Sequence, residues 1–570
     1  MQTTVSDALL TLLKKHGVRH IAGLPAAQIA GIMDGASRSN YFTYVTTRHE
    51  EAAAHMAHAI SRVTGTMGVC FGTVGPGATN LVPGVAAAWG DNIPMLVITA
   101  NNQRKSISPG KDLLQNADQI ELYRPITKWN AQIRDPERAP ELIEQAIRMA
   151  TTGRPGPVHL DIPCDVGLKK IEFDADASAN RLFPPAADAE AIRMAADMLR
   201  AAKRPVLLAG GGVARAHGTE AFRALLDLTG FPATTTPMGK GAVPPDSPCN
   251  IGCGGFLGGE AQVQALQDAD LILAVGCKFS TWTLVDKPPV YFRPKDQKVI
   301  QIDIDAASIG KNTRADLGIV ADARAALEQL LAELAGGNRF AMEPAWPARL
   351  REHYQAYRAK VGAIADNPLS PKGRINEATA IRMIGRLADK DAIFAYDGGQ
   401  TMEWAHTFIH PSHPDNSLFN PGMGHLGAGL PFANAAKLAH PDRQVVLITG
   451  DGALGCTIQE LETAARYGLK IIAVVINDSC WGMYRPFGEY VYNNPDFGID
   501  LTDVDFATVA KGFGCHGEKV TDLAQLPAAF QRAAAADRPA VIDVVCEFTQ
   551  HPMDFAWPTV VLHDMELPIG

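Results

Sequence analysis

Short apolar runs alternate with longer segments of helical apolar spacing from the N-terminus to near residue 550. The helical segments include EEAAAHMAHAISRV at 50–63 and PELIEQAIRMATT at 140–152. The apolar runs are VCFGTV (69–74), MLVITA (95–100), VHLDI (158–162), PVLLAGGG (205–212), LILAVG (271–276), VIQIDID (299–305), AIFAYDGG (392–399), VVLITGDG (445–452), IIAVVIND (471–478) and AVIDVV (540–545). Continuously apolar strands between helices are typical of parallel sheets that are covered on both faces. The pattern therefore predicts an α/β fold with three doubly wound parallel-sheet domains.

Two joints divide these runs into three groups. They are FDADASANRLFPPAADAE (173–190) and FAMEPAWPARLREHYQAYRAK (340–360), and the second has helical periodicity. The predicted units are a first domain at 1–175, a middle domain at 190–340, a third domain at 372–550 and a tail at 551–570. The tail shows no clear element, and we expect it to pack on the surface or over a site. At the N-terminus we expect a helix that starts near Ser6 or Asp7 rather than a signal peptide.

Composition and charge indicate which classes of protein and of binding partner fit this chain. Of the 570 residues, 46% are hydrophobic and 20% are charged, which is enough apolar material for sizeable cores. The formal net charge of −9 argues against nucleic acid as a partner. The chain has no run of about 18 or more apolar residues, so we expect no membrane span. Nine cysteines are spread thinly along the chain, and we interpret them as buried thiols of a reducing, cytoplasmic environment.

The most specific chemical pattern lies where two successive strands of the third domain end. One strand, VVLIT, ends in Gly-Asp-Gly with Asp451 at its centre, and the other, IIAVVI, ends in Asn477-Asp478; 24 residues (453–476) lie between the two motifs. The carboxyl ends of parallel strands meet at one edge of a sheet, where open α/β sheets bind ligands. Asp451 and Asp478, together with a backbone carbonyl at Cys480, offer hard oxygen ligands that suit Mg²⁺ and a diphosphate.

A helix pattern, ALGCTIQELETAARYG, follows the first of these strand ends. The backbone N–H groups of Gly452 and Ala453 at its start would favour phosphate oxygens. On its own, the Gly-Asp-Gly could also be a plain strand-to-helix turn with Asp451 as the N-cap. The second acidic strand end at this spacing favours the metal and diphosphate interpretation.

With these two strand-end motifs, the chain resembles thiamine diphosphate (ThDP) enzymes of the acetolactate synthase type. The resemblance covers nearly the whole chain. The cofactor motif of that family is a GDG followed some two dozen residues later by a pair that is usually Asn-Asn. The pair here is Asn477-Asp478, so the second metal ligand would be an aspartate that adds one negative charge. The resemblance implies ThDP and Mg²⁺ as cofactors.

Two segments of the first domain carry the same resemblance. RHEEAAAHMAH (48–58) is similar to the family's HEQGAGHMAE, which places the family's catalytic glutamate at Glu50, with Glu51 where Gln is usual. Taken alone, Glu50 could be a solvated acid at a helix N-terminus. GTVGPGATN (72–80) matches the family's GPGATN turn. The turn's candidates for contact with the cofactor or the partner loop are Thr73, Pro76 and Asn80.

Further matches in the first domain add candidates near the reacting carbon. Gln115 stands where the family carries a site glutamine. The family's GYPGGA reads GLPAAQ here (23–28), which brings Pro25 and Gln28 into the expected site. The resemblance therefore implies Glu50, Gln115 and Gln28 as catalytic candidates.

The third domain contains two more matching segments. AYDGGQTMEWAH (395–406) resembles the family's diphosphate loop, and GMGHLGAGLPFANAA (422–436) resembles the segment that holds the cofactor in a bent shape. Leu426 takes the place of the wedging residue, and the carbonyl of Gly424 would accept from the cofactor's amino group. The expected cofactor contacts in this domain are Gly399, Gln400, Thr401, Gly424, Leu426, Gly452, Ala453, Gly482 and Met483.

The middle domain resembles the family's FAD-binding domain in outline. Its matching segments are LLAGGGVARA (207–216), TTTPMGKGAVPPD (234–246), AVGCKFS (274–280) and IQIDIDAASIGKN (300–312). A glycine-rich turn after a strand is weak evidence by itself, and many relatives keep this domain without the flavin, so both states stay open. The candidates for FAD contact are Gly211, Gly212, Thr236, Met238, Gly276, Lys278, Asp303, Ile304 and Asp322.

The resemblance implies a ThDP- and Mg²⁺-dependent carboligase that decarboxylates pyruvate or a similar 2-oxo acid and transfers the acyl unit to an aldehyde or ketone. Glu50 would hydrogen-bond the aminopyrimidine ring of the cofactor. In the family this glutamate and the diphosphate site come from different subunits, so a homodimer or homotetramer with active sites at the subunit interface is implied. Acetolactate synthase proper, a 2-oxo acid decarboxylase and a 1,2-dicarbonyl lyase remain alternatives, as does a non-catalytic relative.

Several departures from the family pattern bear on the acceptor. Trp282 stands where acetolactate synthases carry an arginine, a residue suited to an acceptor carboxylate. Trp89 and Phe487 also replace other aromatic residues of the family. Together these departures favour a bulky or uncharged acceptor. Arg485 is either a substitute cation for the site or a surface residue.

Overall fold

The structure is a computed structural model. The described residues are 2–107, 110–176, 182–255, 259–283, 286, 290–337, 339–485, 488, 489, 493, 494, 496–547, 549, 550 and 552. The predicted C-terminal tail, apart from residue 552, and Phe487 lie outside the described residues.

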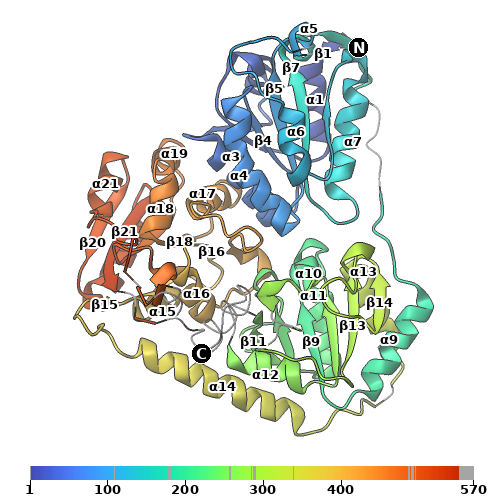
Figure 1. The fold of residues 1–570 in the computed structure, drawn as a ribbon, viewed down its shortest axis with the longest axis vertical. Helices are drawn as coiled ribbons and strands as arrows, with labels where there is room; N and C mark the ends of the chain where they lie inside the picture. Colours follow the sequence, from blue (N-terminus) through green and yellow to red (C-terminus); the bar gives the residue numbers. More distant parts are fainter. Residues whose placement is uncertain are drawn as a thin grey trace.

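Three sheets, each with helices on both sides, form three α/β units (Figure 1). Every strand pair in these three sheets is parallel. A separate pair, β1 (Gln2–Thr4) with β8 (Lys170–Glu172), is antiparallel and joins the two ends of the N-terminal unit. The predicted fold class is therefore confirmed.

The N-terminal sheet has six strands in the order β3-β2-β4-β5-β7-β6. Its strands are β2 (His20–Gly23), β3 (Thr43–Thr46), β4 (Gly68–Gly72), β5 (Met95–Asn101), β6 (Asn130–Gln132) and β7 (Pro157–Pro163). Its helices are α1 (Val5–Lys15), α2 (Ala30–Arg38), α3 (Glu50–Thr64), α4 (Pro76–Asp91), α5 (Arg104–Ile107), α6 (Gln119–Tyr123), α7 (Ala139–Thr151) and α8 (Cys164–Gly167). Helix α1 begins at Val5, because the side chain of Thr4 accepts from the N–H of Asp7 and caps it, so the predicted start was one or two residues late.

The middle sheet also has six strands, in the order β11-β10-β9-β12-β13-β14. Its strands are β9 (Pro205–Ala209), β10 (Ala233–Thr235), β11 (Asn250–Cys253), β12 (Leu271–Val275), β13 (Lys298–Asp303) and β14 (Leu317–Val320). Its helices are α9 (Ala189–Ala201), α10 (Gly211–Arg215), α11 (Thr219–Thr229), α12 (Glu260–Asp268) and α13 (Ala323–Leu334). The long helix α14 (Trp346–Ala365) then runs along the outside of the molecule toward the C-terminal unit, where the second joint was predicted to be helical (Figure 1).

The C-terminal sheet has seven strands, with the order β15-β21-β19-β18-β16-β17 and β20 paired to β21. Its strands are β15 (Ile375–Asn376), β16 (Ile393–Asp397), β17 (Ser417–Leu418), β18 (Val445–Gly450), β19 (Ile472–Asn477), β20 (His516–Val520) and β21 (Ala540–Glu547). Its helices are α15 (Glu377–Leu387), α16 (Gln400–Phe408), α17 (Gly429–Ala439), α18 (Asp451–Thr457), α19 (Glu460–Arg466), α21 (Phe506–Gly512) and α22 (Leu526–Ala535).

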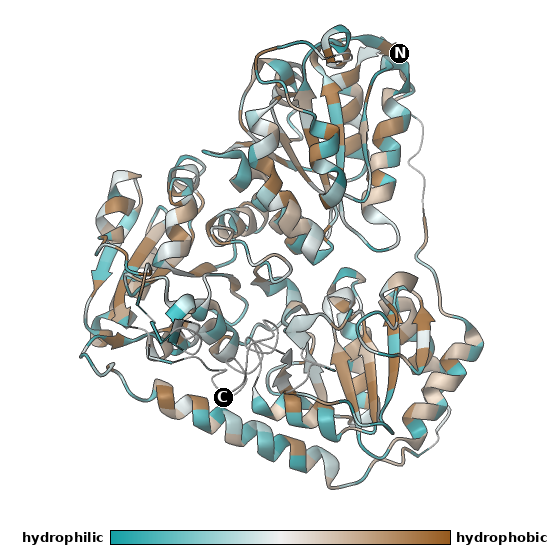
Figure 2. Cartoon of the chain, viewed as in Figure 1, coloured by the Kyte–Doolittle hydropathy of each residue, from teal (hydrophilic) through white to brown (hydrophobic). Residues whose placement is uncertain are grey.

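Burial on both faces explains the continuously apolar strand sequences. In β5, Met95 and Val97 belong to one core and the alternate residues Leu96 and Ile98 to the opposite core. Figure 2 shows the hydrophobic residues concentrated on the sheet strands. The core on the α3 side also contains Phe432 of α17, so the N-terminal and C-terminal units share one apolar interior.

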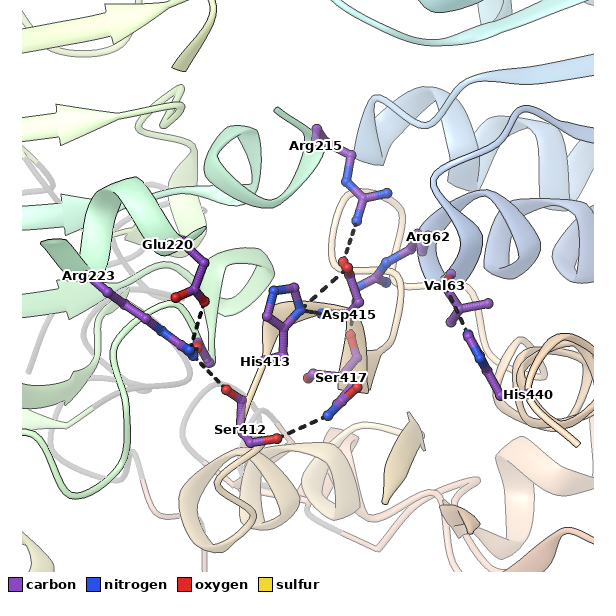
Figure 3. Close-up of polar contacts among 12 residues, drawn as sticks. Arg62, Val63, Arg215, Glu220, Arg223, Ser412, His413, Asp415, Ser417 and His440 are labelled. Carbon is purple, nitrogen blue, oxygen red and sulfur yellow. Dashed lines mark hydrogen bonds and ion pairs between the residues drawn. The ribbon is translucent and has the colours of Figure 1, made fainter. Parts of the chain in front are cut away.

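A polar junction fixes the segment that leads into β17 against the other two units (Figure 3). The buried guanidinium of Arg62 on α3 donates to the carbonyls of Ser417 and Phe419, at 2.6 and 2.5 Å. Arg215 on α10 pairs with Asp415 at 3.2 Å. All three units therefore meet at this segment, which precedes the loop predicted to bend the cofactor.

All nine cysteines are free thiols. Six are buried, Cys164 and Cys253 are half-buried, and Cys456 is exposed, so the prediction of buried thiols is wrong for Cys456. Within the described residues, no helix combines the length and apolar character that crossing a bilayer requires.

Candidate active site

A cavity of about 750 Å³ opens at the carboxyl edge of the C-terminal sheet. The loops after β16, β18 and β19 form much of its wall, as expected for an open parallel sheet. The structure brings together in this wall every cofactor and metal candidate of the third domain. They are Gly399, Gln400, Thr401, Gly424, Leu426, Asp451, Gly452, Ala453, Asp478, Cys480, Gly482 and Met483.

Asp451 is the first residue of α18 and is buried. The N-cap of this helix is Gly450, so the alternative reading of Asp451 as the N-cap is wrong. Its Oδ1 accepts from the N–H of Gly452 at 2.8 Å. Burial, together with the nearby negative charge of Asp478, raises the pKa of Asp451 to about 7.

Asp478 follows β19 and faces the same cavity. The side-chain N–H of Gln400 donates to its Oδ2 at 2.9 Å, while the Oε1 of Gln400 is buried without a hydrogen-bond partner among the described residues. Burial raises the pKa of Asp478 to about 6 despite that hydrogen bond and the nearby charge of Arg485. A buried carboxylate, a half-buried carboxylate and an orphaned amide oxygen in one wall are a donor set that fits Mg²⁺, since a divalent cation relieves the repulsion between the carboxylates.

The loops of this wall are packed tightly against each other. A Cβ on Gly452 would lie 2.7 Å from the indole ring of Trp481, so only glycine fits there. Arg485 is half-buried and pairs with Asp496 at 3.2 Å, so it is neither a fully exposed surface residue nor without a partner.

A second constellation lies in the N-terminal unit. Glu50 is the first residue of α3 and is 7% exposed, so the alternative reading of a solvated acid is wrong. The side-chain amide of Asn80 donates to its Oε2 at 3.0 Å. Nearby, the Thr73 hydroxyl donates to the Oε1 of Gln28 at 3.0 Å. Four of the predicted polar side chains thus form two hydrogen-bonded pairs.

The remaining candidates of this unit differ in exposure. Pro25 and Gln115 are exposed, and Pro76 occupies the first turn of α4. Gln119, which the sequence did not single out, is buried and accepts from the N–H of Gly75 at 2.9 Å. It therefore holds the turn before α4. No sequence signal marked Gln119, because one polar residue in NADQIELY looks like any other.

Glu460 is a second residue that sequence reasoning missed. Its Oε1 accepts from the N–H groups of Arg48 and His49, at 3.0 and 3.1 Å, and so fixes the residues that lead into α3 and Glu50. Burial raises the pKa of Glu460 to about 7. In the sequence it looked like an ordinary acid on a helix surface.

Within the described part of one chain, the two constellations do not line a common cavity. Among the described residues, no residue of 1–175 lines the C-terminal cavity that contains Asp451 and Asp478. Glu50 and the Asp451–Asp478 pair therefore belong to separate parts of the chain.

The middle unit contains a further cavity of about 740 Å³. It is lined by all nine residues predicted for FAD contact, namely Gly211, Gly212, Thr236, Met238, Gly276, Lys278, Asp303, Ile304 and Asp322. Arg154, which pairs with Asp305 at 3.6 Å, and Arg215, which pairs with Asp415, also line it, as does Asp91. Thr281, Trp282 and Pro421 line this cavity and the C-terminal cavity alike, so the two adjoin.

Sequence models of three domain families match the chain in the same order as its three sheets. Residues 3–122 match the N-terminal TPP binding domain of thiamine pyrophosphate enzymes, residues 192–330 match their central domain, and residues 397–544 match their C-terminal TPP binding domain. Each of the three matched ranges contains one of the site regions described above.

Full-length relatives give the same assignment. A probable acetolactate synthase large subunit of Methanocaldococcus jannaschii is 34% identical over 553 residues, which cover 95% of this chain and 92% of the relative. An acetolactate synthase of Mycobacterium bovis is 36% identical over 568 residues, covering 95% and 88%. An acetolactate synthase large subunit of Parasynechococcus marenigrum is 35% identical over 549 residues, covering 94% and 86%. The chain belongs to the thiamine pyrophosphate enzymes, and within them it is an acetolactate synthase-like enzyme that forms carbon–carbon bonds.

Proposed function

We propose that this ThDP-dependent carboligase decarboxylates pyruvate or a similar 2-oxo acid and transfers the acyl unit to a bulky or uncharged aldehyde or ketone. The observation that carries the proposal is the pair of carboxylates, buried Asp451 and half-buried Asp478, in a large cavity at the carboxyl edge of the sheet. A cavity with Trp282, Met402 and Trp481 in its wall suits an acceptor without charge.

The chain's own residues have distinct roles in this proposal. Asp451, Asp478 and the carbonyl of Cys480 would hold Mg²⁺, and the N–H groups at the start of α18 would bind the diphosphate. When bound, ThDP supplies a nucleophilic carbon at which a 2-oxo acid can lose CO₂. Glu50 would hold a proton at the aminopyrimidine ring, and Asn80, which donates to Glu50, would orient that carboxyl group.

The products formed from pyruvate test the reaction. Purified enzyme with ThDP and Mg²⁺ would be given pyruvate alone and pyruvate with a series of aldehydes and ketones. Mixed hydroxyketones that form faster than any product of pyruvate alone support the proposal. Acetolactate formed from pyruvate alone indicates acetolactate synthase proper. Free acetaldehyde indicates a decarboxylase, and turnover of a 1,2-dicarbonyl compound indicates a lyase.

The middle cavity would hold FAD in this proposal. Glycines let two loops of its wall pack closely, as they do in dinucleotide-binding folds: a Cβ on Gly276 would lie 2.5 Å from the Cα of Gly212. Lys278 and the two arginines would offset the charge of a diphosphate. An absorption spectrum with flavin bands in the purified protein supports this assignment, and colourless protein of full activity removes flavin from the reaction.

The active unit would be a homodimer or homotetramer. Supporting this, Glu50 and the C-terminal cavity are separate in the described parts of one chain. A second copy could supply the glutamate that each cavity needs.

A further inference from the structure

A cluster of two imidazoles and a carboxylate lies between α3 and the loop before α17, and one of its members, His425, also lines the C-terminal cavity. The Oε1 of Glu51 is 3.7 Å from the Nε2 of His55 and 3.5 Å from the Nδ1 of His425. The ligand nitrogens of His55 and His425 lie within 4.8 Å of each other. None of these three residues has a role in the proposed reaction.

The facing atoms are buried and have no hydrogen-bond partner. This holds within the described chain for the Oε1 of Glu51, for both ring nitrogens of His55 and for the Nδ1 of His425. His55 is 0% exposed, so bulk solvent does not reach its ring. Buried polar atoms are rarely left in this state, because each one costs free energy unless something binds it.

The Glu51–His55 and Glu51–His425 spacings are close to those of a zinc site. With metal–ligand bonds of about 2.0–2.2 Å, neighbouring ligands of a tetrahedral ion lie roughly 3.3–3.5 Å apart. Glu51 and His55 are four residues apart in α3, which places both side chains on one face of the helix. Two histidines and one carboxylate leave a fourth position for water.

The backbone at the third ligand is also preorganised. The N–H of His425 donates to the Oδ1 of Asn420 at 2.8 Å, and the Nδ2 of Asn420 donates to the carbonyl of His425 at 3.1 Å. The nearby His49 is different, because its Nδ1 already accepts from the N–H of Glu51. The protonation states fit as well: burial lowers the pKa of His55, and the neighbouring histidines hold the pKa of Glu51 low against the effect of its burial.

We infer that Glu51, His55 and His425 bind a transition-metal ion such as Zn²⁺, which joins helix α3 of the N-terminal unit to the loop that carries Leu426. The ion is distinct from the Mg²⁺ of the C-terminal cavity, since none of its three ligands is shared with Asp451 or Asp478. Its effect is structural: it fixes the cofactor-bending loop against the helix that begins with Glu50.

Zinc binding to the purified full-length enzyme tests the inference. Zn²⁺ is added to protein already saturated with Mg²⁺ and ThDP, and bound zinc is measured by atomic absorption after gel filtration. We expect one zinc per chain. Glu51→Gln and His425→Ala should each weaken zinc binding by more than about tenfold, the lower end of what losing even a supporting group costs. Co²⁺ in place of Zn²⁺ should show the intense visible bands of a tetrahedral site.

His440→Gln is the matched control, because His440 also joins the two units, through the carbonyl of Val63 at 3.0 Å, but lies outside the cluster (Figure 3). This variant should keep the zinc. Absence of bound zinc in the wild-type protein overturns the inference. The inference is also overturned if Glu51→Gln and His425→Ala both bind as much zinc as the wild-type protein. The same holds if His440→Gln loses as much zinc as they do. Far-UV circular dichroism of each variant, measured alongside, shows that the variant is folded.

Discussion

At the scale of single residues, the buried carboxyl group of Glu50 and its partner Asn80 carry the proposed proton transfer. Glu50→Gln keeps the size and the hydrogen-bonding oxygen of the side chain but removes its acid function. We expect turnover to fall by about 10²–10⁴-fold, the usual contribution of a positioned acid or base, while ThDP still binds. Initial rates and ThDP calorimetry on the same preparation measure both. Glu137→Gln, at an exposed position of the same unit, should change neither, and a Glu50→Gln enzyme of normal rate would contradict the assignment.

The two aspartates of the C-terminal cavity should respond differently to the loss of charge. Asp451→Asn removes the buried carboxylate at the start of α18, and we expect Mg²⁺-dependent ThDP binding to be lost. Asp478→Asn produces the Asn-Asn pair that is usual in the family, so we expect it to retain activity with weaker Mg²⁺ affinity. Magnesium titrations of ThDP binding distinguish the variants. If both variants lost Mg²⁺-dependent ThDP binding to the same extent, the two carboxylates would be equivalent ligands.

At the scale of elements, Glu460 connects α19 to the residues that lead into α3. Its pKa is raised from 4.5 to about 7 by burial, so between these pH values the folded protein keeps a proton that the unfolded chain releases. The folded state therefore loses stability as pH rises through this window, by an amount of order 3 kcal/mol. Above pH 7 the loss is constant, because both states are then ionised.

Glu460→Gln should remove this pH dependence. The amide oxygen of the glutamine should still accept hydrogen bonds from the N–H groups of Arg48 and His49. Urea unfolding of both proteins across the window measures the difference in slope. Parallel pH profiles would show that Glu460 ionises at its ordinary pKa.

The sequence predicted those features that depend on local pattern. Continuously apolar runs between helices predicted parallel sheets, because strands buried on both faces leave no polar alternation. Asp451 and Asp478 were recognisable because each directly follows a strand. Glu460 and Gln119 were not, because their importance comes from backbone N–H groups that are distant in sequence and meet them only in the fold. The start of α1 was missed for a smaller reason: Thr4, not a later residue, caps it.

At the scale of the whole molecule, the separation of Glu50 from the Asp451 cavity leads to a test by complementation. Glu50→Gln and Asp451→Asn enzymes should each be inactive. If each site takes its glutamate from a second subunit, a co-expressed mixture contains dimers with one intact site. Random pairing then restores about a quarter of wild-type activity. The doubly tagged, purified heterodimer should show about half of wild-type activity, and an inactive heterodimer would place both residues of a site in one chain.

Thr281, Trp282 and Pro421 form a common partition between the middle and C-terminal cavities. A molecule in one cavity that immobilises these shared residues changes the space open to a molecule in the other cavity. Linkage makes any such coupling reciprocal: a nucleotide that tightens substrate binding by some factor is itself bound more tightly by that same factor when substrate is present. A compound that never reaches the metal can therefore set how well this chain handles its substrates.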